Sequence, residues 1–210
     1  MNKVQVNKEH YQFKNYLNKK RWMSIWYQLN EVLSLEPESI LEIGQGAGLF
    51  KIIMNHFDME IKTVDIDPEL NPDIVGSINN LPIATSSYDC VCAFQVLEHL
   101  PYKQALEAFK EMINVSKKYV VISLPDAKVM WTYSIYVPKI GQKTILLPRP
   151  KIQKTTHNFD GEHYWEINKK GYSLNLICKN FLKIGKISLV KNFRIAENPY
   201  HRFFLFAKNY

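Results

Sequence analysis

The sequence contains no uninterrupted apolar run of the ~20 residues that a membrane-spanning helix needs, and its first twenty residues are polar and basic. We therefore predict neither a transmembrane segment nor a secretory leader. Cysteine is scarce as well, because the 210 residues include three. That number excludes a disulfide framework and predicts a cytoplasmic protein. Cys90 and Cys92 lack a second pair of metal ligands nearby, so we expect them to pack in the core.

Acidic residues are absent between Asp126 and Asp160, although this stretch holds six cations. They are Lys128, Lys139, Lys143, Arg149, Lys151 and Lys154. Residues 1–30 contain six more cations against one acid, and the net charge is +7. Such stretches favour phosphate-bearing partners: nucleotide sugars, lipid-linked glycans, RNA or an anionic membrane surface. A solvated basic surface without a specific partner is the alternative.

What the chain does have, from residue 36 onward, is an alternation of short apolar runs and helix-periodic segments. Predicted strands cover 39–43, 61–65, 74–76, 88–94, 119–123, 186–190 and 203–207, and predicted helices cover 48–57, 81–84, 102–115 and 173–181. Alternation of this kind indicates right-handed crossovers and a parallel sheet. We predict one α/β domain with a Rossmann-like, doubly wound, mostly parallel seven-stranded sheet and helices on both faces.

The first strand and the turn after it carry the most specific motif. The apolar run Ile40–Ile43 is followed by glycines at 44, 46 and 48, and the next strand ends in Asp65. Glycines allow a sharp turn and a close approach of the backbone to a ligand. An acidic residue at the tip of the second strand can accept hydrogen bonds from a ribose diol. The segment therefore predicts a nucleotide-binding crevice.

This segment resembles the first motif of class I S-adenosylmethionine-dependent methyltransferases, (D/E)-x-G-x-G-x-G. The resemblance continues through Leu81-Pro82, Tyr88–Val91 and Gln95–Leu100, and it covers roughly residues 36–125. It implies S-adenosylmethionine as the cofactor. The residues that it assigns to the cofactor are Glu42, Gly44, Gln45, Gly46, Gly48, Asp65, Ile66, Ser77, Ile78 and Gln95. Ser77 departs from the family, which often has an aspartate there. Asp67 is expected to cap the following turn.

Glu98 and His99 follow the fourth predicted strand and are the candidate catalytic residues. Leu97-Glu-His99 resembles the Glu-x-x-Glu-His motif of ubiquinone-pathway O-methyltransferases and small-RNA 3′-end methyltransferases, some of which bind a divalent metal there. Here Gln95 replaces the first carboxylate. A hard cation prefers several anionic oxygens, so we predict no metal. His99 titrates near neutrality and suits a general base; a structural histidine is the alternative.

Two segments flank this nucleotide-binding core. Residues 1–35 are predicted to form an N-terminal helical cap, with Trp22 and Trp26 packed in the core, ahead of a methyltransferase domain over 36–210. An insertion at about 125–165 breaks the alternation after the fifth strand, and we expect 127–159 to form a lid over the acceptor. His163 and Tyr164 are the candidate acceptor-binding residues. Their segment Gly161–Glu166 resembles segments of bacterial methyltransferases associated with surface-polysaccharide genes.

Together these features predict an enzyme that transfers a methyl group to a small hydroxylated acceptor, a sugar or glycan precursor that is phosphate- or lipid-linked. Peripheral contact with a membrane is compatible with the basic segments. A nucleic-acid partner is less favoured, because no RNA-binding domain is appended. The alternatives are an RNA or protein methyltransferase and a non-catalytic cofactor-binding subunit that activates a partner. The intact glycine motif argues against the last of these.

Overall fold

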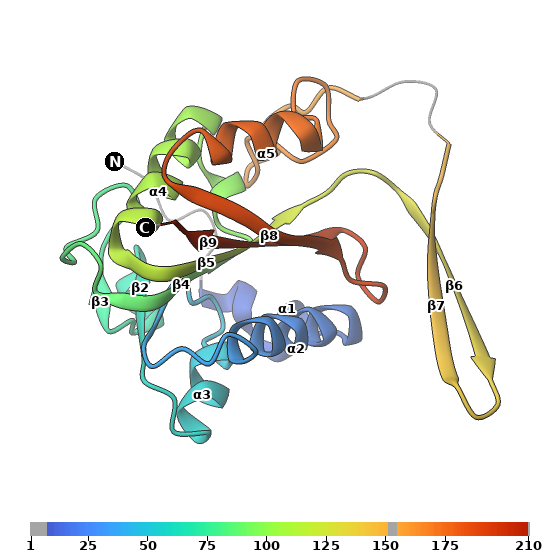
Figure 1. Ribbon diagram of the computed structural model, residues 1–210, viewed down its shortest axis with the longest axis horizontal. Helices are drawn as coiled ribbons and strands as arrows, with labels where there is room; N and C mark the ends of the chain where they lie inside the picture. Colours follow the sequence, from blue (N-terminus) through green and yellow to red (C-terminus); the bar gives the residue numbers. More distant parts are fainter. Residues whose placement is uncertain (1–7, 151–154, 210) are drawn as a thin grey trace.

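The computed structural model describes residues 8–150 and 155–209, and within them a seven-stranded sheet forms the centre of the molecule (Figure 1). The strand order is β3-β2-β1-β4-β5-β9-β8. The strands are β1 (Ile40–Ile43), β2 (Ile61–Asp65), β3 (Ile74–Val75), β4 (Tyr88–Phe94), β5 (Ser116–Pro125), β8 (Ile187–Arg194) and β9 (His201–Lys208). Strands β1 to β5 pair in parallel, and β9 is antiparallel to both β5 and β8. The predicted fold class is confirmed.

Helices cover both faces of this sheet. Helices α4 (Tyr102–Val115) and α5 (Leu174–Leu182) lie on one face, and α1 (Phe13–Tyr16), α2 (Lys19–Leu33) and α3 (Leu49–His56) lie on the other (Figure 1). Short 3₁₀ turns are η1 (Lys8–Tyr11), η2 (Pro68–Leu70) and η3 (Leu97–His99). Each face has its own buried apolar cluster, one including Phe109 and Phe181, the other Phe50 and Met54. Strand β1 is buried along its whole length because strands flank it and helices cover both its faces.

Local sequence accounts for where several helices begin. The Asn18 side chain accepts a hydrogen bond from the Arg21 backbone N–H and caps α2, and Ser173 caps α5 in the same way through Leu176.

Cys90 and Cys92 are fully buried and unpaired, as predicted. Within the described ranges, no helix has the length and apolarity to cross a membrane.

Two local predictions are wrong. Residues 81–84 form no helix and run in an irregular connection toward β4, because Pro82 and the short apolar stretch cannot hold a helical turn alone. Trp22 and Trp26 are not core residues, since 47% and 49% of their surfaces are exposed. Helix α2 instead buries the side that carries Ile25 and Val32.

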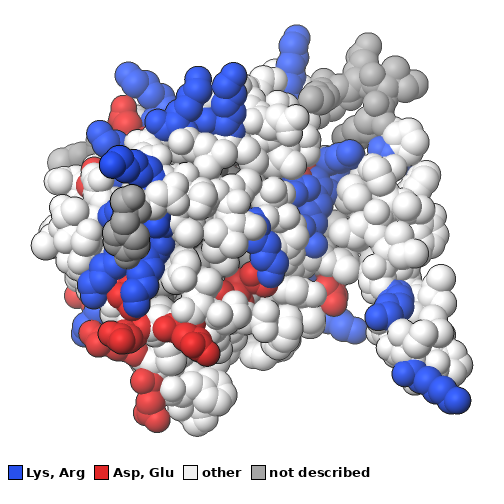
Figure 2. Space-filling model, in the orientation of Figure 1, with Lys and Arg blue, Asp and Glu red and all other residues white. Residues whose placement is uncertain are grey.

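The insertion after β5 contains a β-hairpin that the sequence analysis did not predict. Strands β6 (Met130–Val137) and β7 (Gly141–Pro148) pair with each other and project beyond the sheet (Figure 1). Basic side chains lie at the tip of this projection (Figure 2), where the sequence has Lys139 and Lys143. Lys151 and Lys154 lie outside the described residues. In the described part of 127–159, Phe159 alone lines the cavity at the carboxyl ends of the parallel strands, and the expected lid over the acceptor stays a prediction.

Candidate functional site

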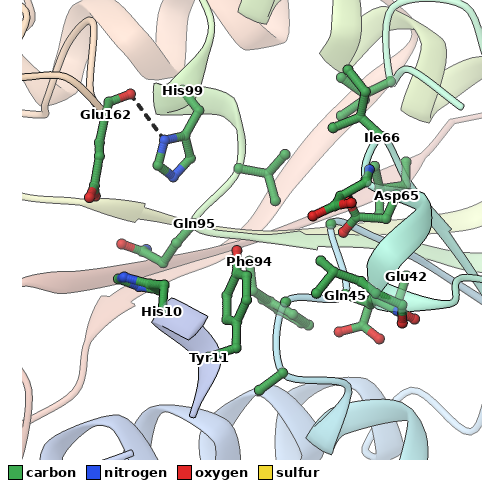
Figure 3. Close-up of a pocket in the computed structure, with 18 of the residues that line it drawn as sticks. His10, Tyr11, Glu42, Gln45, Asp65, Ile66, Phe94, Gln95, His99 and Glu162 are labelled. Atoms are coloured by element: carbon green, nitrogen blue, oxygen red, sulfur yellow. Dashed lines mark hydrogen bonds between the residues drawn. The ribbon is translucent and has the colours of Figure 1, made fainter. Parts of the chain in front are cut away.

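A cavity of about 870 Å³ opens at the carboxyl ends of β1, β2 and β4, where ligands bind in doubly wound folds. Carboxylates of Glu42 and Asp65 lie on one side, His99 and Gln95 lie on the other, and Tyr11 stands between them (Figure 3). Of the ten predicted cofactor-binding residues, all but Gly48 line this cavity. His99, His163 and Tyr164 line it as well, and Glu98 does not.

The turn after β1 is shaped by contacts that leave no space for side chains. Gly44 has φ +76°, and a Cβ atom there would lie 2.5 Å from Cγ2 of Val96. A Cβ atom on Gly46 would lie 3.2 Å from Cε1 of Tyr11. Glycine is therefore required at these two positions, and both line the cavity, so the backbone of the turn borders it.

Two buried carboxylates give this end of the cavity its chemistry. Oε2 of Glu42 is buried without a hydrogen-bond partner, and burial, reinforced by nearby Asp65, raises the pKa of Glu42 well above its usual value. Burial also raises the pKa of Asp65, against the opposing hydrogen bond from the Asp67 backbone N–H (3.0 Å). A cationic group or a pair of hydroxyls would satisfy these oxygens. Asp67 caps η2 by accepting from Glu69 N–H, as predicted.

The remaining predicted cofactor residues complete the wall of the cavity. Ile66 follows Asp65, and Ser77 and Ile78 follow β3. Gln95 ends β4 with φ +58°, an uncommon conformation for a residue other than glycine. Its amide donates to Oγ of Ser123 (3.1 Å). This hydrogen bond fixes the Gln95 side chain between the ends of β4 and β5.

His99 and the segment around His163 are far apart in sequence but are joined by three hydrogen bonds. Nδ1 of His99 lies 3.0 Å from the Glu162 carbonyl oxygen, Tyr164 N–H donates to the Glu98 carbonyl (2.9 Å), and Nε1 of Trp165 donates to the Leu100 carbonyl (3.1 Å). Because a carbonyl oxygen only accepts, Nδ1 of His99 carries a proton, and in the neutral imidazole Nε2 is the basic nitrogen. That nitrogen points away from Glu162 (Figure 3).

The two imidazoles differ in their protonation. Burial, followed by the neighbouring His163, lowers the pKa of His99. Burial also works against a charge on His163, but the hydrogen bond from Nδ1 to Oε1 of Glu166 (3.3 Å) and the nearby carboxylates of Glu98 and Asp160 together raise the pKa of His163. Tyr200 donates to the same Glu166 oxygen (2.6 Å). The lowered pKa of His99 keeps its imidazole neutral near pH 7.

Glu98 lies fully buried behind these histidines, and neither carboxylate oxygen has a hydrogen-bond partner among the described residues. Burial raises the pKa of Glu98 to about 7. Glu98, His99 and His163 each offer an atom within 4.8 Å of the others and could hold a metal ion, as could Asp160, His163 and Glu166. The expectation that no metal binds at Glu98 and His99 stays a prediction.

Several cavity residues were missed by sequence reasoning. Turn η1 and helix α1 contribute His10, Tyr11 and Tyr16, whose rings pack edge to face at centroid distances of 5.2–5.7 Å. The Arg21 guanidinium lies over the Tyr16 ring, 4.7 Å from its centre. The aromatic and basic residues of this stretch are the signal that could have found them. The sequence predicted a helical cap with a basic surface over this stretch, without placing His10, Tyr11 or Tyr16 at the cavity.

A doubly wound sheet, a glycine turn after β1 and a buried acid at the tip of β2 define a nucleotide-binding α/β enzyme of the class I methyltransferase fold. The family profile described as "Methyltransferase domain" matches residues 15–174, and the chain belongs to this family. This membership confirms the predicted S-adenosylmethionine-dependent methyltransferase. The comparison with curated proteins finds no match.

Solved structures agree with this fold at low sequence identity. The PH0226 protein from Pyrococcus horikoshii OT3 is 13% identical, with a TM-score of 0.61 over 97% of this chain and 100% of that one. Magnesium protoporphyrin IX methyltransferase from Synechocystis PCC 6803, solved with bound S-adenosylmethionine, is 12% identical, with a TM-score of 0.60 over 92% and 85%. The Burkholderia thailandensis 1,6-didemethyltoxoflavin-N1-methyltransferase, with substrate and S-adenosylhomocysteine bound, is 10% identical, with a TM-score of 0.62 over 90% and 81%.

His201 makes stability depend on pH. Its side chain is 3% exposed, Nδ1 has no hydrogen-bond partner in the part of the chain that the structure describes, and burial lowers the pKa of His201 to about 3. Below pH 6.5 the His201 imidazole binds a proton in the unfolded chain but not in the folded chain. The contribution of neutral His201 to the unfolding free energy is therefore complete above pH 6.5 and is lost as the pH falls toward 3. We expect His201 to account for about 2 kcal/mol of the unfolding free energy lost between pH 7 and pH 5. Urea unfolding of His201→Gln should show a flatter pH dependence, and parallel curves for the two proteins would contradict this.

Proposed function

We propose that this methyltransferase transfers the methyl group of S-adenosylmethionine to a hydroxyl of a small acceptor, of the class of sugars and glycan precursors. One observation carries the proposal: the neutral imidazole of His99 lines the cavity with Nδ1 held by the Glu162 carbonyl. An acceptor hydroxyl needs such a base, because it is a weak nucleophile while it keeps its proton.

The cofactor end of the cavity fits the proposed donor. Glu42 offers an unpartnered buried oxygen to the positively charged methionine part, and Asp65 offers its carboxylate to the ribose hydroxyls. Gly44 and Gly46 line the cavity, so their backbone can lie against a ligand there. When bound, S-adenosylmethionine supplies a methyl group already activated by its sulfonium centre. The protein then has to align the acceptor and exclude water.

The acceptor end is built by His99, His163 and Tyr164. Nε2 of His99 would take the proton of the acceptor hydroxyl. Tyr164 packs against Phe159 with ring centres 4.4 Å apart, and this pair offers an apolar surface to the C–H face of a sugar ring. Lys20 and Arg21 at the cavity provide positive charge for a phosphate on the acceptor.

The donor half of the proposal predicts that Asp65→Asn weakens S-adenosylmethionine binding by about 10- to 100-fold, the effect of losing a charged acceptor of two hydroxyl hydrogen bonds. Calorimetric titration of wild type and variant measures this. Asp73→Asn is the control, because Asp73 lies next to the sheet but does not line the cavity. No binding heat for wild type, or equal affinities for Asp65→Asn and wild type, contradicts the assignment.

The acceptor half is tested by measuring transfer of labelled methyl groups to nucleotide sugars, lipid-linked glycans, RNA and proteins. We expect product in a hydroxylated carbohydrate class. Label in RNA or protein alone would replace the acceptor assignment and leave the donor site intact. Donor binding without transfer to any class would instead support a cofactor-binding subunit.

A further inference from the structure

The β6–β7 hairpin presents an apolar face that no other described part of the chain covers. Alternate residues of a strand share a face, and the register pairs Trp131 with Leu147, Tyr133 with Ile145 and Ile135 with Lys143. The five apolar members of this set are each 46–57% exposed. We call them the apolar face: Trp131, Tyr133, Ile135, Ile145 and Leu147. A two-stranded hairpin has no core of its own, so this face is available to another surface.

The opposite side of the hairpin is mixed, because Thr132, Ser134, Gln142 and Thr144 lie there together with Met130, Tyr136 and Leu146. Ser134 and Thr144 share a hydrogen bond between their hydroxyls (3.0 Å), and Thr132 donates to the Ala196 carbonyl (3.4 Å) in the β8–β9 connection. The side that carries the hydroxyls therefore turns toward the body of the protein at the base of the hairpin. Because successive side chains alternate, the apolar face turns away from the body.

Charge indicates what covers this face. Lys139 and Lys143 lie at and beside the turn of the hairpin, Arg149 follows β7, and no acid occurs between Asp126 and Asp160. The visible surface of the hairpin in Figure 2 carries blue side chains at its tip and no red ones. Two copies meeting through such hairpins would bring like charges together. An anionic surface, in contrast, complements the positive charge of the hairpin.

We propose that the apolar face docks this enzyme on an anionic lipid bilayer. Trp131 and Tyr133 suit the headgroup level, where aromatic side chains with one polar end gather, and the lysines at the tip reach the lipid phosphates. Open strand edges keep unpaired backbone groups, so the hairpin lies in the interface and does not enter the hydrocarbon. None of these side chains lines the cavity. Docking is therefore independent of the proposed methyl transfer.

Flotation of the purified chain with vesicles tests this. Vesicles of equal parts phosphatidylglycerol and phosphatidylcholine should carry wild type upward, and pure phosphatidylcholine vesicles should not. The matched variants Ile135→Glu and Ser134→Glu add the same charge to neighbouring positions on opposite faces. We expect Ser134→Glu to weaken partitioning about fivefold through charge alone, and Ile135→Glu by about 50-fold or more, because it also removes an apolar contact.

Two controls separate docking on lipid from misfolding and from self-association. The double variant Lys139→Gln, Lys143→Gln should weaken partitioning onto the vesicles by about 25-fold. Calorimetry should give unchanged S-adenosylmethionine binding for every variant, which shows that each one is folded. Absence of flotation by wild type would overturn the proposal, as would equal effects of the two glutamates. It would also be overturned if sedimentation showed that the apolar face joins two copies and that Ile135→Glu separates them.

Discussion

Turnover of the His99→Asn variant is expected to fall by about 10²–10⁴-fold with S-adenosylmethionine affinity unchanged. Asparagine can still donate to the Glu162 carbonyl that holds Nδ1 of His99 at 3.0 Å, but it has no basic atom for the acceptor proton. The variant therefore removes the base while keeping the local hydrogen bond. Single-turnover transfer to the acceptor found in the screen measures the chemical step, and calorimetry measures cofactor affinity.

The pH profile separates a base from a structural histidine. Burial and the neighbouring His163 lower the pKa of His99, so wild-type kcat/KM should fall only as the pH drops below the ordinary imidazole value of about 6.5. The acidic limb should disappear in His99→Asn. His99→Ala should regain activity when free imidazole is added. Turnover of His99→Asn within about threefold of wild type would contradict the role in acid–base catalysis, since such catalysis contributes far more.

Removal of metal ions tests the other use of the same cluster. Glu98, His99 and His163 could together hold an ion, whereas a base needs none. We expect transfer to continue after EDTA treatment and dialysis. If activity is lost with EDTA and returns with a divalent cation, His99 is a metal ligand and the proposed base is wrong.

The nucleotide-binding half of the molecule could be predicted from sequence because its signals are local. The apolar run of β1, the glycines after it and Asp65 at the end of β2 are contiguous motifs, and parallel strands bring their carboxyl ends to one edge. Nine of the ten predicted cofactor residues therefore line one cavity. Gly48 begins α3 with φ +70° and does not line it.

The acceptor half could not be predicted to the same depth because its contacts join distant segments. Tyr200 and Glu166 meet across 34 residues, and nothing in either local sequence indicates the pairing with His163. The hairpin was missed for another reason. The strands of the hairpin do not pack on a core. Their apolar residues therefore fit an element that covers the site as well as one that projects from the domain.

Replacing Asp126 should cause a large loss of stability. Its carboxylate is 1% exposed at the end of β5 and accepts hydrogen bonds from Nε of Arg202 (2.8 Å), Nε of Arg194 (2.9 Å) and the Asn168 amide (2.7 Å). Burial alone would raise the pKa of Asp126, but the two arginines lower it. Asp126→Asn would leave two nearly buried guanidinium groups without their counter-charge. We expect it to lower the unfolding free energy by about 3–5 kcal/mol, measured by urea denaturation.

Asp89 is the matched control, because it is also a buried carboxylate with two cationic partners. Lys117 and Lys118 are 44% and 45% exposed, whereas Arg194 and Arg202 are 4% and 14% exposed. The lysines can turn to water when the carboxylate is neutralised, so Asp89→Asn should lose less stability than Asp126→Asn. If Asp126→Asn does not fold, the triple variant Asp126→Asn, Arg194→Met and Arg202→Met should recover, because it removes the charges together. The role assigned to Asp126 is to neutralise the two buried arginines. Equal losses of unfolding free energy in Asp126→Asn and Asp89→Asn would contradict this role, as would a triple variant less stable than Asp126→Asn.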